Sequence, residues 1–520
     1  MRDVVLAGFM GTGKTTVGRI LADRYGLDFV DLDDEITART RRTPAEIIRQ
    51  DGEEAFREHE SKVLADLAPG HGRVVALGGG TILADRNRQL LADKYLVCLT
   101  ASVETLHERI RTGPDRPLLD GGGALRRLLE TRRSVYDTLM QVDTDGRTPE
   151  GAADAVADAL GLPAAVVPFT RHTKSAIYVR SGAAAELASL LGAKKPGRCL
   201  IVTDDNVAAH GHAERVASSL RDTADVATVI IPAGEAYKSA QSIHAAYQEA
   251  LEFGLQRSDL VVGVGGGVVC DLAGFVAATY MRGTMLALVP TTLLAQADAA
   301  IGGKVGFDFG GIKNLIGAFY PATVVAIDSD TLATLPSSEL AWGAAEIIKI
   351  ALMCSPSLVA DLRSLGGLEA LVDGNSVIKQ AARLKADVVR ADPFERGERM
   401  LLNFGHTVGH ALEAASEYRL PHGAAVAIGM SAEVSVARTC GWTESEVGEI
   451  LRELLDSFEL PARAPDLDAA VAVHAMGHDK KRTGDSVTLA VPERIGRGTL
   501  RALALTDLSS ALGASPGVRA

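Results

Sequence analysis

The sequence predicts an α/β protein of more than one domain, and three observations lead to this. The chain has 520 residues, which is too long for a single hydrophobic core. Short apolar runs alternate with helical patterns over its first two thirds, as is typical of parallel sheets. A glycine-rich loop at residues 8–15 lies between an apolar run and a helical pattern, which indicates a phosphate-binding site on the first sheet.

The composition is that of a globular protein, with 47% hydrophobic and 23% charged residues. A net charge of −12 argues against general binding to nucleic acid or acidic membranes, so anionic ligands need local clusters of Lys and Arg. The five cysteines form no C-x-x-C pair, which favours a reduced, cytoplasmic protein. No run of 18 apolar residues is present, so no membrane span is expected.

The first domain is expected at residues 1–162, built on a parallel sheet. Its strands include the apolar runs 4–7, 74–77 and 95–99. An alanine-rich helix then ends at Gly161, Leu162 and Pro163, a composition that marks a domain exit. Residues 163–174 are therefore expected to be a linker.

The loop from Gly8 to Thr15 matches G-x-x-x-x-G-K-[ST] in full. Its glycines let the backbone wrap a polyphosphate, and the amides at the following helix N-terminus face the anion. We expect Lys14 to reach the β- and γ-phosphates of ATP and Thr15 to hold Mg²⁺.

Further polar features follow the loop. Asp31 and Asp33 stand two apart at a strand end, where one can assist Mg²⁺ through water and the other can take a substrate hydroxyl; the alternative is an acidic helix start. Arg57 lies in a helical pattern, residues 78–80 are three glycines, and Arg116 lies in a lid-like segment. The alternative for Arg57 is a surface ion pair, and the alternative for the glycines is a plain turn.

In their order along the chain, these features make residues 1–162 resemble shikimate kinase, a P-loop kinase. The features are the loop, D-x-D, F-R-x-x-E, G-G-G, R-P-L-L and R-x-x-x-Y. Ser134 departs from the proline usual in this family. The resemblance implies ATP binding by Gly11, Thr12, Gly13, Lys14, Thr15, Thr16 and Arg116. It implies shikimate binding by Asp33, Arg57, Gly79 and Arg132, with Lys14, Asp33 and Arg116 as catalytic residues and Asp31 near Mg²⁺.

A second α/β unit is expected at residues 175–335. The glycine run 263–267 follows an apolar strand, and glycines there let a dinucleotide pyrophosphate approach, so the unit is expected to be Rossmann-like. Strand signals thin out afterwards, which predicts a mainly α-helical domain over 336–514 and a flexible tail over 515–520.

Metal-ligating residues gather in the helical domain. His406 and His410 share a helical face at i, i+4, His422 follows, and Glu346 lies on an apolar helix. Three such ligands with an open position are typical of catalytic zinc, and spacing alone pairs His406 with His410. Basic side chains of residues 175–514 suit a phosphorylated, carboxylated substrate, although surface lysines are the alternative. They are Arg282, Lys304, Lys313, Lys349, Lys385, Arg399, Lys480 and Lys481.

Residues 175–495 resemble 3-dehydroquinate synthase through G-E-x-x-K, G-G-G-V-x-x-D, G-G-K, G-x-K-N, A-E-I-I-K and N-F-G-H-T-V-G-H-A-L-E. The resemblance implies Zn²⁺ or Co²⁺ on Glu346, His406 and His422, and it moves His410 to the substrate. It implies NAD binding by Asp204, Asn206, Glu235, Lys238, Gly266, Gly267, Val268, Asp271, Thr291, Thr292, Lys313, Asn314 and Thr334. It implies substrate binding by Arg282, Asp298, Lys304, Lys313, Asn314, Lys349, Lys385, Arg399, Asn403, His410, Lys480 and Lys481, with Lys304, Lys349, Lys385, Asn403 and His410 catalytic.

The two resemblances together imply a bifunctional enzyme of aromatic amino-acid precursor synthesis. Its substrates would be ATP with shikimate, and the seven-carbon 3-deoxy-D-arabino-heptulosonate 7-phosphate, with NAD used catalytically and a homodimer formed through the synthase part. Three alternatives remain open: another sugar-phosphate cyclase or polyol dehydrogenase of the same fold, a nucleotide-sensing N-terminal module, and an inactive scaffold.

Overall fold

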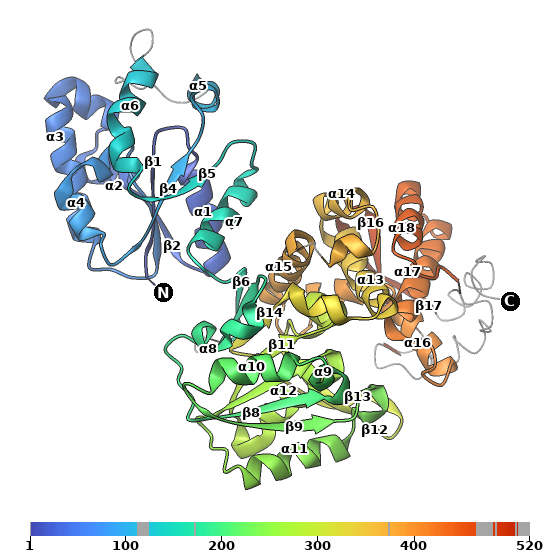
Figure 1. The fold of residues 1–520 in the computed structure, drawn as a ribbon. Helices are drawn as coiled ribbons and strands as arrows, with labels where there is room; N and C mark the ends of the chain where they lie inside the picture. Colours follow the sequence, from blue (N-terminus) through green and yellow to red (C-terminus); the bar gives the residue numbers. More distant parts are fainter. Residues whose placement is uncertain are drawn as a thin grey trace. The chain divides into compact units, whose positions relative to one another are not determined.

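The computed structural model describes residues 2–111, 124–170, 173–372, 375–463, 482–483, 486–504 and 507. The chain forms two compact units, Met1–Val166 and Val167–Ala520. Figure 1 shows their elements along the chain. None of the described helices is both long and apolar enough to span a membrane.

The first unit is built on a five-stranded sheet in the order β2-β3-β1-β4-β5. All its strand pairs are parallel. The strands are β1 (Val4–Gly8), β2 (Asp28–Asp31), β3 (Arg73–Ala76), β4 (Tyr95–Thr100) and β5 (Met140–Asp143). The helices are α1 (Lys14–Tyr25), α2 (Leu32–Thr40), α3 (Pro44–Leu67), α4 (Asp85–Leu90), α5 (Val103–Arg111), α6 (Ala124–Tyr136) and α7 (Pro149–Ala159).

Both faces of this sheet are covered, because successive side chains of a strand point to opposite sides. Val5 of β1 packs with Phe56 of α3 in one buried cluster. Leu6, its neighbour, packs with Leu21 of α1 and Val156 of α7 in another. In Figure 1, α1 and α7 accordingly lie on one side of the sheet and α2 and α3 on the other. This arrangement brings the strand ends that carry the candidate residues to one edge.

The second unit begins with a seven-stranded sheet in the order β6-β7-β14-β11-β10-β8-β9. Its strands are β6 (Ala165–Pro168), β7 (Lys174–Val179), β8 (Arg198–Asp204), β9 (Asp225–Ile231), β10 (Leu260–Gly265), β11 (Met285–Pro290) and β14 (Val324–Ile327). Its helices are α8 (Leu187–Leu190), α9 (Asp205–Ala209), α10 (His212–Leu220), α11 (Ala240–Glu252) and α12 (Gly267–Thr279). A two-stranded hairpin, β12 (Lys304–Phe309) and β13 (Ile312–Phe319), lies outside the sheet.

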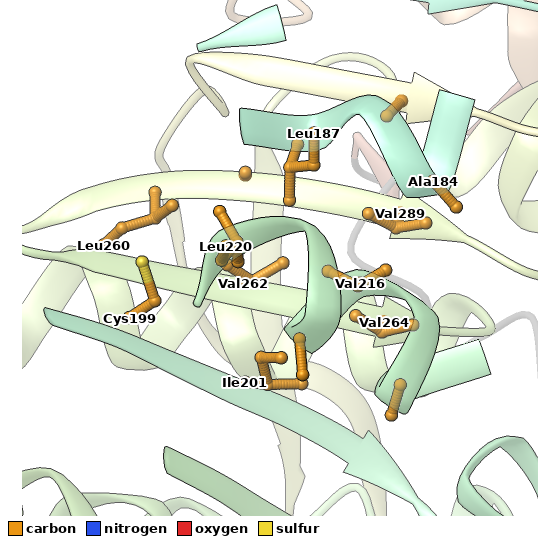
Figure 2. Packing of buried hydrophobic residues seen from close by; sticks show 14 of the residues in the cluster. Ala184, Leu187, Cys199, Ile201, Val216, Leu220, Leu260, Val262, Val264 and Val289 are labelled. Carbon is orange, nitrogen blue, oxygen red and sulfur yellow. The ribbon is translucent and has the colours of Figure 1, made fainter. Parts of the chain in front are cut away.

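The core under α10 joins this helix to the sheet. Figure 2 shows Val216 and Leu220 of α10 against Ile201 of β8 and Val262 and Val264 of β10. These residues are fully buried. The apolar packing holds β8 and β10 in place, and both strands end at the candidate dinucleotide site.

The remaining helices follow the sheet in sequence, as expected for the helical domain. They are α13 (Ser337–Cys354), α14 (Pro356–Ser364), α15 (Asn375–Ala391), α16 (His406–Ala415), α17 (His422–Thr439) and α18 (Ser445–Ser457). Shorter helical turns include η6 (Ala295–Ala299), η7 (Ser329–Thr334) and η9 (Glu398–Asn403).

Two features differ from the sequence expectation. The segment 163–174, expected to be a linker, contains β6, which is part of the seven-stranded sheet. The expected helical domain also contains a three-stranded antiparallel sheet of β15 (Arg482–Thr483), β16 (Ser486–Arg494) and β17 (Arg497–Ala504). The tail expected at residues 515–520 lies outside the described residues.

Candidate active sites

The loop at residues 8–15 connects β1 to α1. Gly8, Gly11 and Gly13 have φ angles of +133°, +84° and +91°, a region that favours glycine. The turn therefore needs glycine at these positions to bring its amides around an anion. Lys14 folds along the loop and donates to Gly8 O at 2.9 Å and to Phe9 O at 3.1 Å.

Two carboxylates meet the loop at the end of β2. Thr15 Oγ1 donates to Asp31 Oδ2 at 2.7 Å, so the hydroxyl expected on Mg²⁺ and its acidic partner are adjacent. Asp31 Oδ1 also accepts from the Asp33 amide at 3.1 Å and caps α2. The helix-cap alternative for this pair therefore holds for Asp31, and it does not exclude a position beside Mg²⁺.

The turn Gly78–Gly80 is where the expected shikimate residues converge. Arg132 Nη1 donates to Gly79 O at 2.9 Å. A Cβ placed on Gly78 would lie 3.1 Å from Asp33 Oδ1, and a Cβ on Gly80 would overlap the Arg57 guanidinium. The glycines therefore make room for two arginines and an aspartate from three different elements. This geometry suits a small carboxylate that carries hydroxyls.

The sequence assigned no role to two residues that reach this site. Glu60, fully buried on α3, accepts from Arg57 Nη1 at 2.6 Å and from the Thr81 hydroxyl. Its spacing of i+3 from Arg57 was the available signal. Arg109 of α5 donates to Gly11 O at 3.4 Å. Arg116, expected on a lid, lies outside the described residues.

The candidate NAD residues follow the carboxyl ends of β8 and β10. These strands are adjacent in the sheet, and the chain proceeds from β8 to β9 on one side and from β10 to β11 on the other. Ligands of open α/β sheets bind at such a switch point. Asp204 ends β8, accepts from Val207 N at 2.9 Å and caps α9, which also contains Asn206. Gly266 caps α12, whose first turn holds Gly267 and Val268.

The remaining NAD candidates lie on several elements. Lys238 Nζ donates to Asp271 Oδ2 of α12 at 2.6 Å, and Thr334 Oγ1 is 2.8 Å from His212 Nε2. Thr291 is buried after β11, and Thr292 Oγ1 accepts from Ala295 N at 3.2 Å. Lys313 Nζ on β13 is 3.5 Å from Glu235 Oε1. Asn314 follows with a φ of +50° and donates its amide to Asp308 at 2.8 Å.

Glu346, His406 and His422 come together in the helical domain. Their ligand atoms lie within 4.8 Å of one another. Both His406 Nε2 and His422 Nε2 are 3.4 Å from Glu346 Oε1. Glu346 is only 1% exposed, and within the described chain neither of its oxygens accepts a hydrogen bond of good geometry. An acceptor in this position fits a cation bound between the three side chains.

Close helix packing builds this group. His406 and His422 are the first residues of α16 and α17. A Cβ on Gly409 would lie 3.0 Å from Ala425 O, and one on Gly429 would overlap the backbone of α16. The two helices therefore approach at glycines, which sets their first residues side by side.

His410, one turn after His406, is exposed and faces the same region. Its ring centroid is 5.3 Å from that of His406 and 5.8 Å from that of His422. A second set of ligand atoms within 4.8 Å joins His410, Glu413 and His422. Of the i, i+4 pair found from spacing, only His406 belongs to the Glu346 group, and the buried set has His422 in place of His410.

Charges in this group shift each other's protonation. Burial acts to raise the pKa of the Glu346 carboxyl, but Lys349 and His406 outweigh burial and hold it well below its usual range. Burial and Lys349 lower the pKa of His406. Burial opposes the charged form of His422, yet Glu346 and Glu413 raise its pKa to about 9.

Two lysines pair with Asp298, and one of them also pairs with a metal candidate. Lys349, 1% exposed, pairs with Glu346 and lies 3.5 Å from Asp298 Oδ1. Lys385 pairs with the same Asp298 carboxylate and donates to Asp298 O at 2.7 Å. Burial outweighs the attraction of Asp298 and lowers the pKa of Lys385 to about 8. The result is one chain of alternating charges, Glu346–Lys349–Asp298–Lys385, in which every member except the partly exposed Asp298 is buried.

The other substrate candidates divide into four groups. Lys304 pairs with Glu395, which also accepts from Asn403 Nδ2 at 3.2 Å; no pattern in the sequence pointed to Glu395. Arg399 is buried and donates to Gly302 O at 3.0 Å. Arg282 is exposed at a φ of +63°, and no ion pair joins it to the other candidates in the described residues. Lys480 and Lys481 lie outside the described residues.

Comparison with known protein families covers most of the chain. Residues 10–161 match the model for shikimate kinase. Residues 228–342 match that for the N-terminal part of 3-dehydroquinate synthase, and residues 343–482 that for its C-terminal part. The 3-dehydroquinate synthase of Symbiobacterium thermophilum is 42% identical over 330 residues, which cover 62% of this chain and 91% of the relative.

Solved structures resemble the second unit. That of 2-epi-5-epi-valiolone synthase from Streptomyces hygroscopicus, with NAD⁺ and Zn²⁺ bound, has a TM-score of 0.60 at 27% identity over 66% of this chain and 98% of that chain. A structure of 2-deoxy-scyllo-inosose synthase shares the fold, with a TM-score of 0.61 at 22% identity over 68% of this chain and 99% of that chain.

One relative covers both units at once. The bifunctional shikimate kinase/3-dehydroquinate synthase of Thermotoga maritima is 32% identical over 506 residues, 95% of this chain and 96% of the relative. The order of the family matches is the order of the two sites along the chain. The chain therefore belongs to the family of bifunctional shikimate kinase/3-dehydroquinate synthases.

Proposed function

We propose that the two units carry two separate active sites with the residue roles given below. The observation that supports this most is the charge chain Glu346–Lys349–Asp298–Lys385, which links a three-ligand metal group to lysines able to bind an anion. Glu346 belongs both to this charge chain and to the three clustered ligands, and ionisable groups perturbed in this way gather at functional sites, so the arrangement favours a catalytic centre.

In the kinase site, Lys14 binds the β- and γ-phosphates of ATP, and the amides of residues 11–16 surround them. Arg57 and Arg132 clamp the shikimate carboxylate at Gly79. Asp33 accepts the proton of the attacking hydroxyl. Mg²⁺, held by Thr15 and through water by Asp31, neutralises phosphate charge when bound. Arg116 is proposed from the family resemblance as the lid arginine.

In the synthase site, the residues present fit the cofactors that the family implies. Glu346, His406 and His422 would hold Zn²⁺ or Co²⁺, because two neutral imidazoles and a carboxylate suit either ion. The NAD candidates described above, of which Asp204 is the first in the chain and Thr334 the last, would hold NAD. When bound, NAD accepts and returns a hydride, and the ion polarises the substrate alcohol.

The chain's own residues bind and orient the seven-carbon substrate. Lys304, Lys385 and Arg399 supply positive charge to its phosphate and carboxylate. His410 lies at the exposed side of the metal group, where it can hold a proton, and Asn403 can hydrogen-bond a ring hydroxyl. The net reaction converts 3-deoxy-D-arabino-heptulosonate 7-phosphate to 3-dehydroquinate and phosphate.

Partners and location are proposed from the family and from composition. The family resemblance supports a homodimer through the synthase part, and the scattered free cysteines support a reduced, cytoplasmic setting. No nucleic-acid or membrane partner is proposed for a chain with a net charge of −12.

The experiment measures both activities on the purified intact chain. Shikimate-dependent ADP formation should require ATP and Mg²⁺, and phosphate release from the seven-carbon substrate should require NAD and a divalent metal. No phosphate release with NAD and Zn²⁺ or Co²⁺ present would contradict the synthase assignment. If ATP changed synthase activity without any shikimate phosphorylation, a regulatory N-terminal unit would replace the kinase.

A further inference from the structure

Glu413 of α16 is a buried carboxylate with two different partners. It is 1% exposed, so its charge must be compensated by nearby groups. Oε1 accepts from Lys313 Nζ on β13 at 2.9 Å. Oε2 lies 3.3 Å from Nδ1 of His422, the first residue of α17. One carboxylate thus joins the metal candidates to the hairpin that carries Lys313.

The hydrogen bond with Glu413 fixes the form of the His422 ring. An ionised carboxylate only accepts hydrogen bonds, so His422 must donate its Nδ1–H to Glu413. In the neutral ring, which is the form that binds a metal ion, Nε2 then carries the lone pair. This atom is the one 3.4 Å from Glu346 Oε1. His406 is held in the same form, because its Nδ1 is 3.1 Å from the carbonyl oxygen of Phe404. Both rings therefore present a lone pair to the same point.

We propose that Glu413 is a positioning residue that fixes the His422 ring for the divalent ion and ties this ring to Lys313. The inference rests on the proposed metal site. A metal-bound imidazole is commonly oriented by a hydrogen-bond partner that does not itself contact the ion. Removing such a partner lowers metal affinity about 10- to 100-fold. Glu413 differs from the carbonyl that holds His406, because its second oxygen binds a lysine proposed to contact NAD and substrate.

The first test measures metal binding by the full-length chain, stripped of metal and titrated with Zn²⁺ against a chromophoric chelator. Glu413→Gln is expected to weaken Zn²⁺ binding about 10- to 100-fold, because an amide cannot accept from both the ring and the lysine. The matched control is Lys313→Met, which removes the other partner of Glu413 and leaves the ring in place. It is expected to change Zn²⁺ affinity less than about threefold, which separates ring orientation from general loss of a buried ion pair.

A spectroscopic measurement on the wild-type chain tests the same claim without a variant. In the Co²⁺-loaded protein, two exchangeable, paramagnetically shifted ring N–H signals are expected, one from each histidine. Observing only one, or finding the ion on His422 Nδ1, would overturn the proposal even if Glu413→Gln did not fold.

The outcomes separate this inference from the proposed function. If the wild-type chain bound neither Zn²⁺ nor Co²⁺, both the metal site and the role of Glu413 would be overturned. If the wild-type chain bound Zn²⁺ and Glu413→Gln bound it within twofold of the same affinity, only the role of Glu413 would fall.

Discussion

Glu60 is the residue whose replacement gives the sharpest test of the kinase site. Its buried carboxylate accepts from Arg57 at 2.6 Å on one oxygen and from the Thr81 hydroxyl on the other. In Glu60→Gln, one of these donors must face an amide NH₂ group instead of an acceptor. The guanidinium of Arg57 is then no longer held toward the Gly78–Gly80 turn by this carboxylate.

The size of the effect follows from the charge on both partners of this hydrogen bond. A hydrogen bond to a charged group contributes about 1.5–3 kcal/mol, which corresponds to about 10- to 150-fold in kcat/KM. The effect should appear in KM for shikimate, because the proposed contact of Arg57 with the carboxylate is made in the ground state and the transition state alike. KM for ATP should stay unchanged.

Glu53 supplies a matched control on the same helix. It also pairs with Arg57, at 2.7 Å and i, i+4, but its side chain is 48% exposed. Exposed pairs of this kind contribute about 0.3–0.5 kcal/mol, so Glu53→Gln should change kcat/KM about twofold. A coupled assay of ADP release measures both variants. Equal small effects of the two substitutions, or an equal rise in KM for ATP, would refute the reasoning.

Three further predictions concern the synthase unit. Lys349→Met leaves the buried carboxylate of Glu346 without its lysine, while Asp298 keeps Lys385. Urea unfolding of the metal-free chain should therefore show a loss of about 3–5 kcal/mol, and an unchanged midpoint would contradict the ion-pair account. Burial lowers the pKa of Lys385 to about 8, so its charge is lost as pH rises through 8 and kcat/KM for the seven-carbon substrate should fall there. Lys385→Arg should move this fall to higher pH. A profile that is flat to about pH 9.5, or roughly the same in both proteins, would exclude Lys385 as the anion-binding group. Gly409→Ala places a Cβ 3.0 Å from Ala425 O, so thermal unfolding should show about 1–3 kcal/mol of destabilisation, and titration with Zn²⁺ should show weaker binding. An unfolding midpoint equal to that of wild type would show that α16 and α17 can separate freely.

Local chemistry explains why much of the first site was predictable. The glycines at 8, 11 and 13 have positive φ angles, and glycine is the residue that adopts them at little cost, so the loop is visible in the residues themselves. The motif F-R-x-x-E already contained Glu60, but its hydrogen bond with Thr81 spans 21 residues and depends on the packing of α3 against the turn.

The metal candidates show what spacing could not supply. His406 and His410 share a helical face, and a one-dimensional pattern therefore pairs them. The buried group instead contains His422, because α16 and α17 meet at Gly409 and Gly429 and set their first residues together. Such an approach is a tertiary property, and only the family resemblance pointed to it from the sequence.

The missed strands have a simpler cause. In β16 the residues Val487, Leu489 and Val491 alternate with less buried or smaller ones, which was the available strand signal. A proline such as Pro492 is uncommon inside a strand, and here it lies at a register shift of the β16–β17 pair.

The central claim is that one chain carries two chemically independent active sites, and a pair of single substitutions tests it. In the intact chain, Lys14→Ala should abolish shikimate-dependent ADP formation and leave phosphate release from the seven-carbon substrate within about twofold of wild type, a limit set by roughly 0.4 kcal/mol. His422→Ala should do the reverse. Loss of both activities in either folded variant, or of neither, would contradict the claim.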